Sequence, residues 1–247
     1  MAEFLVFQLY GALASWGDIA TGEYRPSQGQ PSKSAVTGLL GAALGITRAD
    51  DAAQAALAKN YGTAVCIRAG GEPLRDYHTI QVPGGDAAYA TRRQELLSDR
   101  LKLNTVLSQR DYRTDAYYQI AVWPVGNDAP HTLEALYHAL RRPKFSLYLG
   151  RRSCPAALPL YPQRMPDVTL KQAFDSYPLD KAQPWLGLLD NGAPVAYVWE
   201  QGGLNTQETG MESSMRHVRR DQVVSRTRWQ FTDRTEYYHA EFASGGP

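Results

Sequence analysis

The stretch RPSQGQPSKSAVTGLLGAALGI, residues 25–46, predicts a helix that packs closely against a sheet and organises the rest of the chain. Pro31 and Ser32 mark its start, because proline restricts φ and a serine hydroxyl can accept a hydrogen bond from the free N–H groups of a first turn. Apolar residues then recur with helical spacing at Val36, Leu39, Leu40, Ala43 and Leu44. Glycines at positions 38, 41 and 45 lower helix propensity, a cost that is tolerable where a helix must approach another backbone.

The first turn of this helix is a candidate anion site. Lys33 and Ser34 lie there, and the N–H groups of a first turn have no partner within the helix. These N–H groups and the positive end of the helix dipole favour a negatively charged ligand. An ordinary buried helix with a solvated first turn explains the same residues, so both interpretations stay open.

The composition is that of an ordinary globular protein. Of 247 residues, 43% are hydrophobic and 21% are charged, and the net charge is +1 at pH 7. A chain of this kind can bury a sizeable core, and a nucleic-acid binder with so small a net charge must concentrate its cations locally. Neither a signal peptide nor a run of membrane-spanning length is recognisable. We therefore expect a soluble, cytoplasmic protein.

A strand–helix–strand unit is predicted around the glycine-rich helix. Residues 4–10 and 61–68 are apolar runs bounded by turn residues, and each predicts a strand. Between them, Asp50 or Asp51 is expected to cap a second, alanine-rich helix. This order of elements is typical of the split βαβ unit of ferredoxin-like folds.

A second strand–helix pair follows later in the chain. Residues 117–125 predict a core strand, and residues 132–140 predict an amphipathic helix capped by Thr132. A short apolar strand is expected to run from Phe145 into Gly150. We therefore predict an α+β fold with a ferredoxin-like palm, and we assign residues 1–79 and 115–155 to that palm.

Two further parts complete the predicted organisation. Residues 80–114 are basic and poor in large apolar residues, which predicts a thumb inserted into the palm, with a long solvated loop as the alternative. Its cations are Arg92, Arg93, Arg100, Lys102, Arg110 and Arg113. Residues 156–247 are expected to form a smaller, β-rich extension packed on the palm, with strands over 194–200 and 228–242 and a loop over 202–220.

Two other groups of cations favour an anionic partner. One surrounds the expected strand near Gly150, and its members are Arg141, Arg142, Lys144, Arg151 and Arg152. The other lies near the C-terminus, and its members are Arg216, Arg219, Arg220, Arg226 and Arg228. Arginine binds phosphate with a planar pair of donors, and glycine lets a backbone come close, so Gly150–Ser153 is a candidate phosphate-binding loop. Surface solubility is the alternative for each group taken separately.

Nucleic-acid bases and catalysis call for different side chains. Candidates for stacking on unpaired bases are Trp16, Tyr77, His78 and Tyr112. No Walker loop, HExxH sequence, paired CxxC or nucleophile elbow is present, and His78 beside Asp76 is the strongest candidate for acid–base chemistry. Five histidines without a close pair, and the isolated Cys66 and Cys154, indicate no metal site. We expect neither a metal nor another cofactor.

Four motifs together resemble a known family. They are YGALASWGD (residues 10–18), the glycine-rich stretch at 25–46, LRDYHT (74–79) and YLGRRSCP (148–155). In this order they resemble the CasD family of the type I-E CRISPR surveillance complex, Cascade. The resemblance covers residues 1–155 and continues more loosely through RTRWQFTDR at 226–234.

The resemblance implies an RNA-recognition-motif-like palm with an inserted thumb, and a role without catalysis. The family holds the 5′ handle of the mature CRISPR RNA (crRNA) and caps the backbone filament of Cascade in antiviral defence. The implied partners are the crRNA, the repeated backbone subunit and the large subunit that recognises the protospacer-adjacent motif. Target DNA is met only through the complex, and no membrane is involved.

The resemblance also implies particular RNA contacts. The residues expected to bind handle phosphates are Arg25, Lys33, Ser34, Gly150, Arg151, Arg152 and Ser153. Those expected to shape the handle pocket are Arg75, Tyr77 and His78. Arg110 and Tyr112, at the base of the thumb, are expected to contact RNA where the handle meets the spacer.

Two alternatives stay open at this point. In a related CRISPR subtype the corresponding subunit is a metal-independent endoribonuclease that processes precursor crRNA with Tyr, Lys and His side chains. Tyr24, Lys33 and His78 supply these residue types here. A structural adaptor with incidental RNA contact is the second alternative, and it predicts that removing the charges of Arg151 and Arg152 leaves RNA affinity intact.

Overall fold

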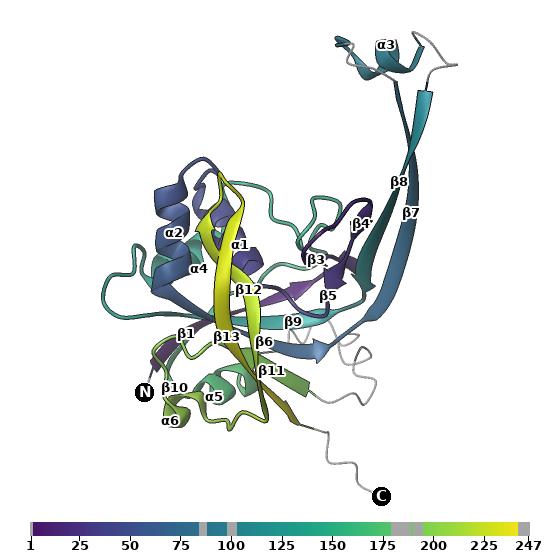
Figure 1. Cartoon of the computed structure of the whole chain (residues 1–247). Coiled ribbons are helices and arrows are strands. Elements are labelled where there is room, and N and C mark those ends of the chain that lie inside the picture. The colour runs from purple at the N-terminus through teal and green to yellow at the C-terminus, as the bar shows by residue number, and fades with distance from the viewer. Residues whose placement is uncertain (1, 84–87, 98–102, 179–188, 190–194, 242–247) are drawn as a thin grey trace, which may run out of the picture.

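A seven-stranded sheet forms the centre of the protein (Figure 1). The computed structural model describes residues 2–83, 88–97, 103–178, 189 and 195–241. The strand order in the sheet is β10-β1-β9-β6-β11-β13-β12, and every neighbouring pair is antiparallel. The fold is therefore a mixed α/β structure with a mostly antiparallel sheet, as the α+β prediction requires.

Four neighbouring strands of the sheet are β1 (Ala2–Tyr10), β6 (Tyr61–Ala69) and β9 (Tyr117–Pro124), which were predicted for the palm, and β10 (Gln163–Val168), which was not. The helices between β1 and β6 are α1 (Lys33–Leu44) and α2 (Asp51–Asn60), and α4 (Leu133–Arg141) lies between β9 and β10. Ser32, Asp50 and Thr132 cap these helices through their side chains, which confirms the predicted helix starts.

The prediction of a strand from Phe145 into Gly150 is wrong. The backbone N–H groups of Lys144 and Phe145 donate to the carbonyl groups of Ala43 and Ala42, so this segment docks on the end of α1 instead of pairing with a strand. Only an isolated bridge joins Tyr148 to Pro155. The strand that follows α4 in the sheet is β10, which lies beyond the predicted palm boundary at residue 155.

The C-terminal part extends the same sheet beyond β6. Its strands are β11 (Val195–Trp199), β12 (Met215–Ser225) and β13 (Gln230–Glu241), and its helices are α5 (Leu170–Asp175) and α6 (Thr206–Thr209). β11 pairs directly with β6 of the palm. The prediction of a loop over residues 202–220 is wrong where β12 begins. The predicted strands over 194–200 and 228–242 correspond to β11 and β13.

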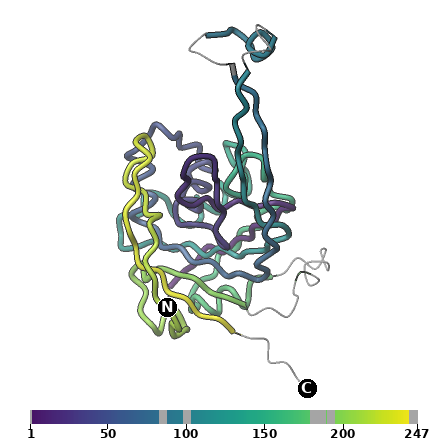
Figure 2. The backbone as a smooth tube through the Cα atoms, turned by 45° about the vertical axis from the view of Figure 1, so that its right-hand side comes forward, coloured from purple at the N-terminus to yellow at the C-terminus, as the bar shows by residue number. Residues whose placement is uncertain are grey.

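A long hairpin projects from one side of the sheet (Figures 1 and 2). Its strands are β7 (Glu72–Pro83) and β8 (Leu103–Thr114), and α3 (Arg92–Leu97) lies at its far end. The hairpin begins at Glu72, before the predicted thumb boundary at residue 80, and includes the LRDYHT motif. Arg100 and Lys102 of the predicted thumb lie outside the described residues.

Short strands join the base of this hairpin to the segment before α1. They are β2 (Leu13–Ala14), β3 (Trp16–Gly17), β4 (Tyr24–Arg25) and β5 (Ser27–Gln28). β2 and β4 both pair with β8, and β3 pairs with β5. The residues that precede the glycine-rich helix are thereby fixed against the hairpin.

Both faces of β1 are buried. Leu5, Phe7 and Leu9 belong to the core beneath α1 and α4, whereas Phe4 and Val6 belong to the core on the α5 side. Side chains alternate along a strand, so a strand covered on both faces is apolar throughout. No helix in the described part of the chain is long and apolar enough to cross a membrane.

Candidate nucleic-acid interface

The loop Gly150–Ser153 lies against the base of the projecting hairpin. The Nη2 atom of Arg151 donates to the carbonyl oxygen of Arg25 at 3.0 Å, and the Arg151 guanidinium lies 5.1 Å from the ring centroid of Tyr112. Arg151 is half-buried by these contacts, whereas Arg152 and Ser153 are exposed. Arg151 therefore anchors the loop, and Arg152 is the cation that the loop presents to solvent.

Gly150 is required by the shape of this loop. Its φ is +83°, a left-handed conformation that side chains disfavour, and a Cβ atom there would lie 1.9 Å from the carbonyl oxygen of Ser15. The backbone of Leu149 accepts a hydrogen bond from the Ser15 N–H and donates one to Cys154. The loop is thus fixed on one side by β2–β3 and closed by its own backbone.

One face of the hairpin base carries a closed polar cluster. Arg75 and Asp111 lie opposite each other on β7 and β8, with Nε to Oδ1 at 2.8 Å and Nη2 to Oδ2 at 3.2 Å. Tyr24 donates its hydroxyl to Asp111 and accepts from Arg75 at 3.1 Å. The hydrogen bond from Arg75 lowers the pKa of Asp111, and the hydrogen bond to Asp111 raises the pKa of Tyr24. The charge of Arg75 is therefore compensated within the protein.

The other face of the hairpin base carries His78, Arg110 and Tyr112, whereas Tyr77 shares the face of Arg75. The register of β7 and β8 has no irregularity, so Asp76, His78, Arg110 and Tyr112 share a face opposite to Arg75. Nε2 of His78 contacts the carboxylate of Asp76. Tyr112 is buried, and Arg110 is half-buried beside Arg25 on β4. The hairpin therefore divides the predicted handle-pocket residues between two faces.

Two of the four predicted stacking residues have solvent access. Tyr77 is 56% exposed and His78 is half-buried. Trp16 is buried in the core and makes an edge contact with Tyr118. Tyr112 is buried beneath Arg151. Stacking by Trp16 is therefore ruled out in this conformation, and Tyr77 is the most exposed candidate.

The prediction for Lys33 is corrected by the structure. Its ammonium group is buried and forms an ion pair with Glu200 at the end of β11. Burial lowers the pKa of Lys33, and the Glu200 carboxylate opposes that change. With its charge buried and paired, Lys33 presents nothing to a phosphate, and we remove it from the candidate interface.

The N-terminus of α1 does bind an anion, but the anion is part of the protein. Oδ2 of Asp221 on β12 accepts a hydrogen bond from the Lys33 N–H at 2.8 Å. The hydroxyl of Ser32 accepts from the N–H of Ala35, and it lies 2.9 Å from the hydroxyl of Ser34. The physical argument for an anion at this helix end is thus sound, but its proposed ligand, an RNA phosphate, is replaced by Asp221.

A network of buried charges holds Asp221 in place. Arg234 on β13 donates to both carboxylate oxygens of Asp221, at 2.6 and 2.9 Å, and Nη2 of Arg234 also contacts Glu236. Arg219 lies within 4 Å of the same two carboxylates. Arg219 therefore stabilises the β12–β13 pair, although the sequence placed it in a cluster available to an anionic partner.

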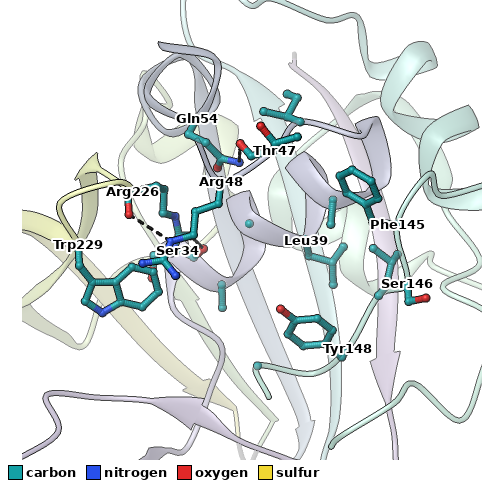
Figure 3. A pocket seen from close by; sticks show the side chains of 16 residues that line it. Ser34, Leu39, Thr47, Arg48, Gln54, Phe145, Ser146, Tyr148, Arg226 and Trp229 are labelled. Carbon is teal, nitrogen blue, oxygen red and sulfur yellow. Dashed lines mark hydrogen bonds between the residues drawn. The ribbon is translucent and has the colours of Figure 1, made fainter. Parts of the chain in front are cut away.

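A groove beside α1 was not predicted (Figure 3). It has a volume of about 530 Å³ and lies between α1, the segment before Gly150 and the β12–β13 turn. Arg48, Tyr148, Arg226 and Trp229 border it. Arg226 and Trp229 belong to the RTRW motif, but Arg48 is 178 residues away from Arg226, and no sequence pattern joins them.

No metal site is found in the described part of the chain, where no group of three or more His, Cys, Asp or Glu side chains is placed to hold an ion. Cys66 and Cys154 are free and buried, and burial raises the pKa of Cys66 to about 12. These thiols are therefore parts of the core.

Known proteins resemble this chain in sequence and in fold. Residues 4–235 match the family described as "CRISPR-associated protein (Cas_Cas5)". The "CRISPR system Cascade subunit CasD" of Escherichia coli K12 is 32% identical over 169 residues, which is 65% of this chain and 70% of that relative. These two findings come from sequence alone.

Solved structures agree on the fold. A chain of a "CRISPR RNA-guided surveillance complex" matches with a TM-score of 0.64 and 20% identity, over 97% of this chain and 90% of its own length. A "Cas protein" crystal structure matches with a TM-score of 0.58 and 24% identity, over 97% and 95%. At these identities the structural likeness supports the fold only. Since the family match covers most of the sequence, the chain belongs to the Cas5 family of CRISPR-associated proteins.

Proposed function

We propose that this protein is a non-catalytic, RNA-binding subunit of a type I-E Cascade complex, where it binds the 5′ handle of the crRNA and caps the backbone filament. The similarity to CasD of Escherichia coli supports the assignment to Cascade. The crRNA, the backbone subunit and the large PAM-recognising subunit are the proposed partners, and target DNA is met only through the assembled complex.

The observation that carries the RNA-binding proposal is the loop Gly150–Ser153, the arginine loop, which docks at the base of the hairpin. Arg151 fixes the loop through Arg25 and Tyr112, and Arg152 remains exposed at its tip. The hairpin base adds the half-buried Arg110 and the exposed Tyr77. Arginines and exposed aromatic rings are the side-chain types that bind the phosphates and unpaired bases of single-stranded RNA, and Tyr77 lies on the face of the hairpin opposite to Arg110.

We also infer that β10, β1, β9 and β6 form a ferredoxin-like palm. Apart from the short strands β2–β5 and the hairpin β7–α3–β8, the order of elements from β1 to β10 is strand, two helices, strand, strand, helix, strand, and the spatial order of these strands is fourth, first, third, second. This arrangement supports the βαββαβ pattern of ferredoxin-like folds. In this proposal β11, β13 and β12 extend the palm at the β6 edge.

The endoribonuclease alternative depends on Tyr24, Lys33 and His78. Lys33 is buried in an ion pair with Glu200, and the Tyr24 hydroxyl is bonded to Asp111 and Arg75. His78 lies on the face of β7 opposite to Arg75. A cleaving trio needs an accessible proton acceptor and a cation that meet at one phosphate, so these contacts favour the non-catalytic proposal.

A gel assay tests the proposal. Labelled CRISPR repeat RNA is incubated in chelator with the wild type, with His78→Ala and with a scrambled RNA of equal length as competitor. We expect a shifted, uncut repeat RNA with both proteins and weaker binding of the scrambled RNA. A discrete cut that disappears in His78→Ala would make the endoribonuclease the correct function. Equal binding of both RNAs would contradict recognition of the handle.

A further inference from the structure

The groove beside α1 holds two arginines that share an aromatic platform. The guanidinium of Arg48 lies 4.4 Å from the ring centroid of Trp229, and that of Arg226 lies 5.5 Å from the same ring. Figure 3 shows both side chains beside Trp229 at one end of the groove. Two like charges held this close repel each other, and a bound anion would relieve the repulsion.

The carboxylate next to these arginines is already occupied. Asp51 accepts hydrogen bonds from the backbone N–H groups of Arg226 and Thr227, at 2.8 and 2.9 Å, and from the Ser225 hydroxyl at 2.7 Å. Within the described residues, neither Arg48 nor Arg226 forms an ion pair with an acidic side chain. Burial and the charge of Arg48 lower the pKa of Arg226. The positive charge at this end of the groove is therefore uncompensated.

α1 and the β12–β13 turn both position the guanidinium group of Arg226. The Arg226 guanidinium donates to the carbonyl oxygen of Ser34, and a Cβ atom on Gly38 would lie only 3.0 Å from Nη2 of Arg226. Gly38 thus makes room for the arginine, at a cost of about 1 kcal/mol of helix propensity relative to alanine. Trp229 has a φ of +57°, which is uncommon for a bulky residue and fixes its ring at the groove.

The opposite side of the groove offers a free aromatic face. Tyr148 is 44% exposed, and Figure 3 shows its ring between Trp229 and Phe145. Gly150 lines the same groove and also begins the arginine loop at the hairpin base. The groove and the arginine loop are therefore contiguous through Gly150.

We propose that this groove binds one unpaired nucleotide of the RNA, with its phosphate between Arg48 and Arg226 and its base stacked on Tyr148. Trp229 holds the two guanidinium groups and is not the base platform. This inference rests on the proposed function, because the RNA reaches the groove along the arginine loop. It adds a second contact point, separate from the hairpin base, to the path of the RNA.

The test measures the affinity of the full chain for fluorescently labelled repeat RNA as a function of salt. Arg48→Ala removes an exposed cation, and Tyr148→Leu keeps an apolar side chain but removes the stacking face. Arg164→Ala on β10 at the far edge of the sheet is the matched control, and thermal unfolding checks that all variants fold. A second readout uses RNAs in which 2-aminopurine replaces one handle base at a time.

We expect Tyr148→Leu to weaken binding about tenfold with an unchanged salt slope, since stacking carries no charge. Arg48→Ala should weaken binding and lower the slope by about 0.7, as expected for one lost contact with single-stranded RNA. One 2-aminopurine position should be quenched by the wild type and should regain fluorescence with Tyr148→Leu. Arg164→Ala should behave as the wild type does.

Other results would overturn the inference in distinguishable ways. If Arg152→Ala weakens binding but both groove variants bind as the wild type does, the proposed function stands and the groove does not bind RNA. If those groove variants then fail to assemble with the other subunits, the occupant is an acidic protein segment. If the wild type itself fails to bind repeat RNA, the proposed function and this inference both fall.

Discussion

Nζ of Lys33 lies 2.7 Å from Oε1 of Glu200, and the two residues are only 5% and 8% exposed. The same carboxylate accepts hydrogen bonds from the backbone N–H and the hydroxyl of Thr63. The contact therefore joins the first turn of α1 to two strands of the sheet. Lys33, which was predicted to bind a ligand, therefore has a structural role.

Replacing Lys33 should destabilise the fold. Lys33→Met leaves a buried carboxylate without its cation, and we expect a loss of about 3–5 kcal/mol in the free energy of unfolding, measured with denaturant. Adding Glu200→Gln should recover part of this loss, because no buried charge then stays unpaired. An unchanged stability combined with weaker RNA binding would return Lys33 to the interface.

In the arginine loop, Arg152 should supply positive charge for RNA binding, and Arg151 should stabilise the conformation of the loop. Arg152→Ala, which removes an exposed cation, should weaken binding of repeat RNA about tenfold and lower the salt slope without changing stability. Arg151→Ala should also lower the unfolding temperature, because Arg151 contacts Tyr112 and the Arg25 carbonyl. Arg164→Ala is the matched control. If the double variant Arg151→Ala, Arg152→Ala keeps the wild-type dependence of RNA affinity on salt, the adaptor hypothesis is favoured.

Gly150 should tolerate no side chain. Gly150→Ala forces a methyl group against the Ser15 carbonyl and adds about 1–2 kcal/mol for the left-handed backbone. Gly22→Ala is the matched control, since Gly22 has a φ of +55° but no heavy atom within 4 Å of the position that an added methyl group would take. Thermal unfolding should therefore show a larger loss for Gly150→Ala. Equal losses would mean that the loop can move away from Ser15.

Asp111 should titrate at an unusually low pH. Its hydrogen bonds with Arg75 are the largest cause of its lowered pKa, so NMR titration should give a midpoint below 3.8 that returns toward 3.8 in Arg75→Ala. Because the folded pKa lies below the unfolded one, the stabilisation is present above the unfolded pKa and is lost as the pH falls through the folded pKa. The same midpoint in both proteins would contradict the role of Arg75.

Local features of the fold were predictable from the sequence because they depend on neighbouring residues. Ser32 and Thr132 cap their helices as predicted. Leu5, Phe7 and Leu9 of β1 belong to one core and Phe4 and Val6 to the other, as the alternation of side chains along a strand requires. Segment 145–149 misled the prediction because the backbone N–H groups of Lys144 and Phe145 bond to the last turn of α1, and composition alone does not distinguish such docking from pairing in a sheet.

The candidate interface was predictable only in part. Exposure of Arg152 and Tyr77 agrees with a binding role, but the burial of Lys33, Trp16 and Tyr112 depends on residues far away in the chain. The hairpin also separates neighbours such as Arg75 and Asp76, because successive side chains of a strand point to opposite faces. A sequence motif names such neighbours together but does not show on which face of the strand each side chain lies.

The helix starts, the apolar faces, the family and the presence of arginine-rich loops follow from the amino-acid sequence. Each of these depends on short-range periodicity or on residue types. Which cations stay available depends on how the chain packs in three dimensions. Asp221 reaches the start of α1 across 188 residues, and Arg48 meets the β12–β13 turn across 178. Charges attract or repel through space, so their partners follow from the packing of the sheet and not from their order in the chain.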